Sequence, residues 1–332
     1  MILITGATGL VGSHLAMYLL KSEDKIRAIY RNVKSIEKTK KVFELYKKQD
    51  LFSRIEWISA DINDVLALEI AFEGVEYVYH CAALISFDPK DENQLRKINI
   101  EGTANIVNFC LAKNIKKLCH VSSIAALGDL QDHKDTIDEE TDWNPEKAHS
   151  FYSISKYGSE IEVFRGQQEG LKVVIVNAGV VLGPGFFESG SGEIFTRIKN
   201  GMPFYTNGST AVVAVVDLVK IMHLLMKSNI NGERFAVFAA NITYKKLVET
   251  IAKSLKVKPP KRKIPKIILN LAWRIDWFLA NILFQKRKIS RDLAYSLTSK
   301  DLYANDKIIT LLNYNFKNFE QTIDEVVETS KI

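Results

Sequence analysis

Along the first 180 residues, apolar positions follow two patterns in turn. Some form short runs of strand length, and others recur at the spacing of a helix. Six apolar runs of strand length occupy residues 2–4, 25–30, 54–59, 75–80, 117–121 and 173–176. Apolar residues at helical spacing occupy residues 10–20, 65–72, 93–112 and 150–168. Because strands that alternate with helices pair in parallel through right-handed crossovers, this order predicts an α/β fold with a doubly wound parallel sheet.

A glycine turn joins the first predicted strand to the first predicted helix. It reads Gly6-Ala7-Thr8-Gly9-Leu10-Val11-Gly12, one residue wider in its first gap than the common G-x-G-x-x-G. Glycines let the chain approach a pyrophosphate closely, and the helix N-terminus offers N–H groups to its oxygens. The turn therefore predicts a Rossmann-type dinucleotide site; the alternative is a turn whose glycines serve packing only.

The residue after the second strand bears on which dinucleotide is bound. Tyr30 ends that strand, Arg31 follows and Lys34 lies just beyond, whereas an Asp or Glu would favour the ribose hydroxyls of NAD. A guanidinium suits a 2′-phosphate, so we expect NADP(H), with NAD as the alternative and a solvated Arg31 as the competing interpretation. Asp61, after the third strand, could hold the adenine amino group or cap the next helix.

Tyr152 and Lys156 lie one turn apart on a predicted helix and so share a face. A nearby ammonium is expected to lower the pKa of the phenol, which would make the pair a general acid and base. Ser123 ends the fifth strand, in Val121-Ser122-Ser123, and we expect it, rather than Ser122, to hold a substrate oxygen. The alternatives are a surface helix pair and serines that satisfy turn backbone groups.

Together these motifs resemble the extended short-chain dehydrogenases/reductases, the NAD-dependent epimerase/dehydratase superfamily. The resemblance rests on residues 5–12, 80–83, 99–103, 121–123, Tyr152 with Lys156, and 178–185. It looks closer to the dihydroflavonol-reductase and hydroxysteroid-dehydrogenase branch than to the sugar-nucleotide epimerases. It implies Ser123 as carbonyl polariser, Tyr152 as acid/base and Lys156 as ribose clamp, with Asn99 supporting a proton relay. Ala178 stands where the family often has proline.

The motifs and the resemblance together predict one set of cofactor contacts. Its members are Gly6, Thr8, Gly9, Leu10, Val11, Gly12, Arg31, Lys34, Asp61, Ile62, Cys81, Ala82, Ala83, Val121, Tyr152, Lys156, Ala178, Val180 and Val181. We expect an NADP-binding domain over 1–180, its sheet completed by parts of 205–240. A smaller, mainly substrate-binding lobe is expected over 181–332.

A basic and apolar window lies near the C-terminus. Residues 251–300 hold 13 Lys and Arg but 2 Asp and Glu, and 267–284 are largely apolar. Arg274 and Asp276 near the middle of that stretch argue against a membrane span. Three interpretations stay open: a buried or lid helix over an apolar substrate site, which is favoured, a membrane-surface helix through 261–288, or a contact between two copies of the chain.

Composition narrows the functional classes. The chain has 332 residues, 47% of them hydrophobic and 25% charged, as in soluble globular proteins. The net charge of +6 is concentrated in one window, so we expect no nucleic-acid partner. Three cysteines without ligand spacing predict no metal site and, with no signal-peptide pattern before the first strand, a cytoplasmic protein.

The expected function is an NADP(H)-dependent oxidoreductase that reduces a carbonyl, or oxidises an alcohol, of a hydrophobic small molecule. One alternative is a nucleotide-sugar epimerase or dehydratase that retains bound NAD. Another is a redox sensor that binds NADP without chemistry, against which the Ser123, Tyr152 and Lys156 set argues.

Overall fold

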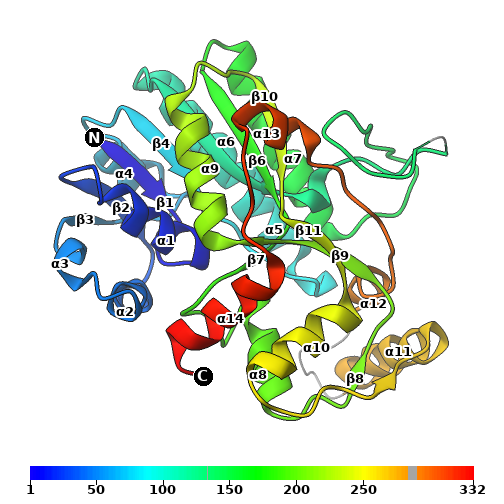
Figure 1. Ribbon diagram of the computed structural model, residues 1–332. Coiled ribbons are helices and arrows are strands. Elements are labelled where there is room, and N and C mark those ends of the chain that lie inside the picture. The colour runs from blue at the N-terminus through cyan, green and yellow to red at the C-terminus, as the bar shows by residue number, and fades with distance from the viewer. Residues whose placement is uncertain (133, 283–289) are drawn as a thin grey trace.

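The apolar runs form the strands of one large parallel sheet (Figure 1). The computed structural model describes residues 1–132, 134–282 and 290–332. Its sheet has the order β10-β6-β5-β4-β1-β2-β3, and every neighbouring pair is parallel. The strands are β1 (Ile2–Thr5), β2 (Ile26–Tyr30), β3 (Ile55–Ser59), β4 (Tyr77–His80), β5 (Lys117–Ser123), β6 (Val173–Ala178) and β10 (Glu233–Val237). The predicted doubly wound α/β fold is confirmed.

Both faces of this sheet are buried, which explains why its strands are apolar without alternation. Neighbouring residues of one strand enter different apolar clusters: Leu3 packs on one face and Ile4 on the other. The Ile4 face is covered by α1 (Leu10–Leu19) and α9 (Val215–Lys227), with α2 (Ile36–Leu45) and α3 (Gln49–Phe52) beside them. The Leu3 face is covered by α4 (Val65–Ala71), α6 (Gly102–Ala112) and α7 (Phe151–Gln168).

The predicted helix over 93–112 is confirmed, and it contains one π-helical turn. It comprises α5 (Glu92–Leu95), a π-helical turn (Arg96–Glu101) and α6. The turn carries Asn99, whose side chain is fully committed to hydrogen bonds outside the helix. Single π-helical turns of this kind occur frequently at functional sites.

The second half of the chain adds smaller sheets and a third apolar cluster. β7 (Val180–Leu182), β9 (Ser209–Ala214) and β11 (Ala240–Thr243) form one sheet, and β8 (Phe204–Tyr205) pairs with β12 (Arg262–Lys263). Phe195, Leu247 and Ile323 belong to the third cluster. The helices here are α8 (Glu193–Lys199), α10 (Tyr244–Ser254), α11 (Lys266–Ile282), α12 (Arg291–Ser296), α13 (Asp306–Leu312) and α14 (Phe319–Ser330).

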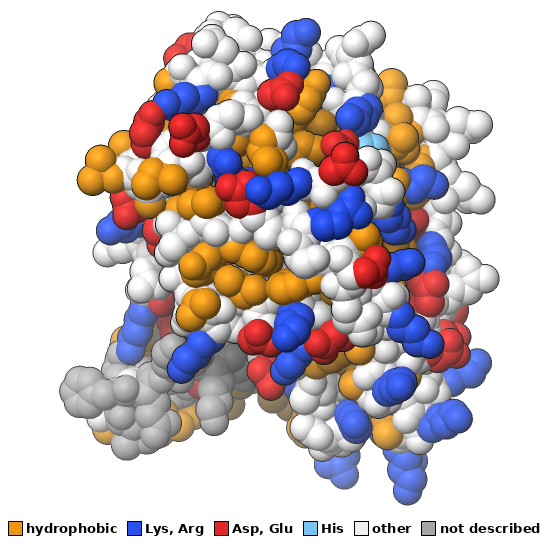
Figure 2. All heavy atoms as spheres, turned by 90° about the vertical axis from the view of Figure 1, so that its left-hand side faces the viewer, with side chains coloured by type: hydrophobic (Ala, Val, Ile, Leu, Met, Phe, Trp, Pro, Cys, Tyr) orange, Lys and Arg blue, Asp and Glu red, His pale blue; other side chains and the backbone are white. Residues whose placement is uncertain are grey.

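Positively and negatively charged side chains are mixed on one side of the molecule. On the side of the molecule that carries β2, β3, α2 and α3, Lys and Arg side chains are interspersed with Asp and Glu (Figure 2). Within the described part of the chain, no helix combines the length and hydrophobicity that crossing a bilayer requires.

Candidate active site

The glycine turn between β1 and α1 packs against the end of β4. Gly6 has a φ of +68°, and a Cβ built there would lie 2.6 Å from the nitrogen of Ala82. A Cβ on Gly12 would lie 2.3 Å from the carbonyl oxygen of Gly6. Gly6 and Gly12 are therefore required by the packing of the turn itself.

Gly9 differs from the other two glycines of the turn. A Cβ on Gly9 would meet only the oxygen of Gly6, at 3.4 Å, and its φ of −103° suits any residue. Gly9 is also the N-cap of α1, and no side chain caps that helix end. Packing alone therefore does not account for a glycine here, whereas a phosphate group lying against the N-terminal N–H groups of α1 would. The turn thus fits a dinucleotide.

The predicted adenosine end lies beyond β2 and β3. Arg31 is 63% exposed, and its Nη1 lies 3.9 Å from Oδ2 of Asp61. Oδ1 of Asp61 accepts a hydrogen bond from the backbone of Asn63 at 2.9 Å. The N-cap of α4 is Asp64, so the alternative assignment of Asp61 as that cap is wrong. Lys34 lies exposed in the short 3-10 helix Val33–Ser35 that follows Arg31.

Ile62, also predicted to contact the cofactor, is engaged with the protein. Its side chain is 5% exposed and lies where a Cβ on Gly102 would come within 2.5 Å. Its carbonyl oxygen accepts a hydrogen bond from Asn105 at 3.0 Å. Ile62 therefore packs the loop that follows β3 against α6.

The structure brings Ser123, Tyr152 and Lys156 together at the carboxyl end of β5. Ser150 caps the N-terminus of α7 through a hydrogen bond from the nitrogen of Ser153, and this places Tyr152 in the first turn. The hydroxyl of Ser123 lies close to the phenol of Tyr152 and influences its pKa. Lys156 Nζ donates to the carbonyl oxygen of Val121 at 2.9 Å. The arrangement contains a hydroxyl pair beside a buried ammonium.

Burial controls the protonation of this group. It raises the pKa of Tyr152, and the nearby hydroxyl of Ser123 opposes that shift only in part. Burial also lowers the pKa of Lys156 to about 8. The expectation that Lys156 lowers the pKa of the phenol is wrong for this state of the protein, because desolvation of Tyr152 outweighs any effect of the ammonium.

The two serines that end β5 point to different sides. Successive strand residues face opposite directions, and Ser122 Oγ donates to the buried carboxylate of Glu160. Ser123 Oγ accepts from the nitrogen of Ala125 at 3.2 Å and also reaches Tyr152. Ser123 therefore satisfies a turn and faces the phenol, whereas Ser122 is part of the protein interior.

Asn99 ties the loop after β4 to α7. Its Nδ2 donates to the carbonyl oxygen of Leu84 at 2.9 Å and to Ser155 Oγ at 2.8 Å, while Oδ1 accepts from the nitrogen of Leu84 at 2.7 Å. Ser155 directly precedes Lys156. Asn99 is 1% exposed and contacts the reacting groups only through this scaffold.

The remaining predicted contacts lie along the carboxyl ends of the central strands. Cys81, Ala82 and Ala83 follow β4, and burial raises the pKa of Cys81 well above its usual range. Ala178 ends β6 and is 5% exposed. Val180 and Val181 are half-buried in β7, where they pair with β9.

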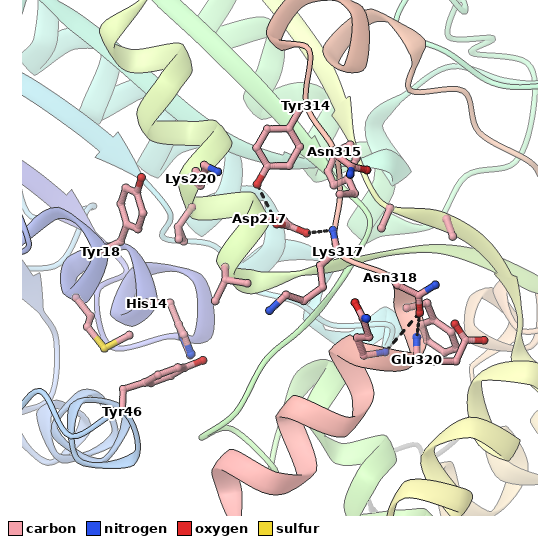
Figure 3. Close-up of a pocket in the computed structure, with 18 of the residues that line it drawn as sticks. His14, Tyr18, Tyr46, Asp217, Lys220, Tyr314, Asn315, Lys317, Asn318 and Glu320 are labelled. Carbon is pink, nitrogen blue, oxygen red and sulfur yellow. Dashed lines mark hydrogen bonds between the residues drawn. The ribbon is translucent and has the colours of Figure 1, made fainter.

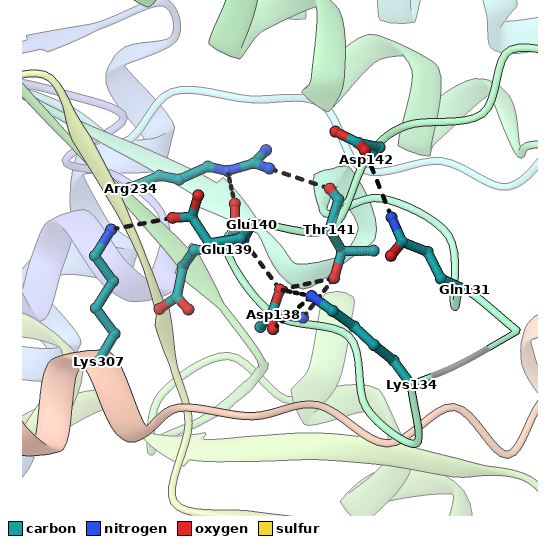
Figure 4. Close-up of polar contacts among 9 residues, drawn as sticks. All are labelled: Gln131, Lys134, Asp138, Glu139, Glu140, Thr141, Asp142, Arg234 and Lys307. Carbon is teal, nitrogen blue, oxygen red and sulfur yellow. Dashed lines mark hydrogen bonds and ion pairs between the residues drawn. The ribbon is translucent and has the colours of Figure 1, made fainter.

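Sequence reasoning missed a buried polar network beneath these residues. Glu160 lies one turn after Lys156 on α7 and accepts hydrogen bonds from Ser122, Asn177 and Arg234. Arg234, from β10, also donates to the carbonyl oxygens of Glu139 at 2.9 Å and Thr141 at 3.4 Å (Figure 4). The regular spacing of Tyr152, Lys156 and Glu160 is the signal that could have pointed to it.

A hollow of about 1030 Å³ lies away from this group, between α1, α9 and residues 314–321 (Figure 3). His14, Tyr18 and Lys220 line it, and Asp217 is held there by the hydroxyl of Tyr314. It contains none of the predicted catalytic or cofactor residues and lies on the α1 face of the sheet, whereas α7 covers the other. Among the described residues, no cluster of His, Cys, Asp and Glu could hold a metal ion.

The fold and the site define a class of enzyme that uses a nicotinamide cofactor on small molecules. The profile of the NAD-dependent epimerase/dehydratase family matches residues 2–238, so the chain belongs to that family. It is an NAD(P)-dependent oxidoreductase of the extended short-chain dehydrogenase/reductase type.

Relatives and solved structures agree with this assignment. A protein named putative dihydroflavonol 4-reductase from Synechocystis is 29% identical over 83% of this chain and 79% of the relative. Sterol demethylase protein B from Methylococcus capsulatus is 27% identical over 79% and 77%. The crystal structure of gox2253 superposes with a TM-score of 0.81 and 25% identity over 99% and 97% of the two chains. A nucleoside-diphosphate-sugar epimerase from Pseudomonas aeruginosa, 18% identical over 99% and 97%, shares the fold with a TM-score of 0.76.

Proposed function

We propose that this protein is an NADP(H)-dependent reductase of a carbonyl on a hydrophobic small molecule, working reversibly as an alcohol dehydrogenase. The observation that carries the proposal is the approach of the Ser123 hydroxyl to the phenol of Tyr152, one turn from the buried Lys156. The first relatives named above include a dihydroflavonol reductase, which also supports a reductase.

When bound, the cofactor supplies or accepts the hydride. Ser123 holds the substrate oxygen by a hydrogen bond, and Tyr152 donates its hydroxyl proton to that oxygen as negative charge develops there. The raised pKa of Tyr152 keeps the phenol protonated at neutral pH, as the reductive direction requires. Lys156, anchored on Val121, provides a positive charge behind the phenol and a donor for the cofactor ribose.

Apolar side chains near Tyr152 support a hydrophobic substrate. The ring of Phe87 lies with its centroid 5.7 Å from that of Tyr152. Ile85, on the same loop after β4, is 59% exposed. A sugar-nucleotide substrate would find less complementarity in such a loop, because its hydroxyls need hydrogen-bond partners.

Replacing Tyr152 by Phe tests the chemical role. We expect kcat for carbonyl reduction to fall by about 100-fold or more, the usual contribution of a general acid, while NADPH affinity stays near that of the unmodified protein. Tyr157→Phe is the matched control, since Tyr157 lies on the same helix and stacks on Trp143 with its ring. NADPH absorbance across aromatic, steroidal and aliphatic carbonyls gives the rates. Turnover that survives Tyr152→Phe refutes the assignment.

Replacing Arg31 by Ala tests the NADP(H) preference. Arg31 is exposed beside Asp61, where a 2′-phosphate would gain a charged partner. We expect the KM for NADPH to rise about tenfold and that for NADH to change little. Measuring both constants on both proteins gives the ratio. An unchanged ratio means that Arg31 does not read the phosphate.

Cofactor exchange separates this proposal from its alternatives. A reductase releases its cofactor in each cycle, so the purified protein should exchange NADP(H) freely, as measured by ultrafiltration and absorbance. Tightly held NAD in the purified protein would instead favour an epimerase or dehydratase. Good NADPH affinity without turnover on any carbonyl would favour a redox sensor.

A further inference from the structure

Helix α11 presents a broad apolar surface to solvent. At 3.6 residues per turn, seven of its side chains fall within one arc of about 120° that includes no polar residue. They expose between 48% and 81% of their surface and are Ile267, Ile268, Leu271, Ile275, Phe278, Leu279 and Ile282. Soluble proteins rarely leave so continuous an apolar patch uncovered unless it binds a partner.

This outer arc is not the face by which α11 joins the protein. Leu269 and Ala280 lie on the opposite side of the helix and are each 4% exposed. On its inner side α11 packs against α12. In Figure 1, α11 lies at the lower right edge of the molecule, beyond α10 and far from the large sheet. The arc therefore faces away from the chain's own core, which does not favour a lid over an internal site.

A basic segment leads directly into the apolar arc. Residues 253–274 include no Asp or Glu. They hold eight exposed cations, at Lys253, Lys256, Lys258, Lys261, Arg262, Lys263, Lys266 and Arg274. Arg262 and Lys263 form β12, which pairs with β8, and Phe204 of β8 is itself 40% exposed. Positive charge and exposed apolar surface thus occupy neighbouring elements.

We propose that α11 and the basic segment before it form an interfacial anchor that seats the protein on an anionic lipid bilayer. The apolar arc would enter the boundary between headgroups and acyl chains, with the helix axis in the membrane plane. The cations would meet the lipid phosphates. Trp277 is 52% exposed on the same helix, about 80° beyond the nearer edge of the arc, so the proposal does not depend on it. Pairing two copies through this face would bring like charges together, so the lipid surface is the better match.

The sequence allows a membrane-surface helix through 261–288. The proposal uses only those residues of this range that the structure describes. Lys286, Arg287 and Lys288 were also expected to flank the membrane-surface helix, and they lie outside the described residues. The proposal needs none of them, because the eight cations before and within α11 already supply the charge.

Flotation of the full-length protein with vesicles tests the anchor. We expect the protein to float with vesicles that mix phosphatidylcholine and phosphatidylglycerol, and to bind those of phosphatidylcholine alone more weakly. Added salt should weaken binding to the mixed vesicles, because it screens exposed charges. Failure to float with the mixed vesicles overturns the proposal.

Two pairs of variants identify the surface responsible. The double change Ile275→Asp and Phe278→Asp should lower the partition coefficient by at least about tenfold, because two apolar groups leave the interface. Leu66→Asp is its control, since Leu66 is 82% exposed on α4. The triple change of Lys261, Arg262 and Lys263 to Glu should abolish the preference for phosphatidylglycerol. Lys40→Glu with Lys41→Glu, on α2, is the matched charge control and should change little.

Folding and oligomeric state are measured on the same proteins. Circular dichroism and the melting temperature should match those of the unmodified chain, since every changed side chain is exposed. Sedimentation velocity reports the number of copies. A dimer that dissociates on Ile275→Asp and Phe278→Asp, in a protein that ignores vesicles, overturns the proposal in favour of self-association. Equal flotation by α11 variants and their controls overturns it too.

Discussion

At the scale of single residues, the site depends on how burial sets protonation. Lys156 is 2% exposed, and this lowers its pKa to about 8, whereas the same environment raises the pKa of Tyr152. The two shifts leave both groups protonated at neutral pH, which is the state from which a phenol can donate. Ser123 completes the group, because its hydroxyl reaches the phenol and its neighbour Ser122 does not.

These shifts predict a specific pH dependence. Because the pKa of Lys156 is lowered, the ammonium is present below about pH 8 and is lost above it. Tyr152, with a raised pKa, keeps its proton over the same range. We expect kcat/KM for NADPH to fall above about pH 8, by up to about tenfold per pH unit. In Lys156→Arg, whose cation does not titrate, the fall should vanish even if the overall rate is lower. A wild-type profile that stays flat into the ordinary lysine range contradicts this prediction.

At the scale of elements, strand ends and helix starts place the functional groups. α1 begins at the glycine turn without a side-chain cap, and α7 begins at Ser150 so that Tyr152 meets the end of β5. The π-helical turn lets Asn99 bond both the loop after β4 and Ser155 of α7. The helices α1 and α7 thus place functional groups through their N-termini, and the π-helical turn does so through its departure from α-helical geometry.

Substitutions in the glycine turn distinguish its role in packing from its role in ligand binding. Gly12→Ala puts a methyl group 2.3 Å from a backbone oxygen and should lower the free energy of unfolding by about 3 kcal/mol. Gly9→Ala meets no close contact, so its stability should change by less than about 1 kcal/mol. Its Kd for NADPH should nevertheless rise about tenfold or more, since the methyl group would lie where the cofactor phosphate is expected. Denaturant titration and cofactor titration measure the two effects. Unchanged affinity in Gly9→Ala would leave packing as the only role of the turn.

At the scale of the whole molecule, a buried charge pair links segments far apart in the chain. Arg234 of β10 bonds Glu160 of α7 at 3.2 Å and also holds the backbone of residues 139–141. Glu139 in turn accepts from the nitrogen of Ala236 at 2.7 Å. The edge strand β10, helix α7 and the loop that leads to α7 are therefore fixed together.

Breaking this pair should destabilise the fold in a pH-dependent way. In Arg234→Met the buried carboxylate of Glu160 loses its cation, so the free energy of unfolding at neutral pH should fall by about 3 kcal/mol. Burial raises the pKa of Glu160 above its unfolded value, so the penalty is full above the raised pKa and disappears below the unfolded one. Denaturant unfolding at several pH values should show the deficit shrinking as pH falls through that window.

A double variant supplies the control for that experiment. Arg234→Met combined with Glu160→Gln leaves no unpaired buried charge, so it should be more stable at neutral pH than Arg234→Met alone. A deficit in Arg234→Met that does not change with pH would mean that Glu160 is not its source.

The sequence by itself determined the features that local physics specifies. Strand and helix periods, the glycine turn and the Tyr152–Lys156 spacing each depend on a few neighbouring residues, and they sufficed for the fold and the family. Only the tertiary structure decided what depends on burial and distant contacts. It placed Ser122 against Glu160, reversed the expected pKa shift of Tyr152, introduced a π-helical turn at Asn99 and joined Glu160 to Arg234 across 74 positions. It also turned the apolar arc of α11 outward, because desolvation and exposure are properties of the assembled chain.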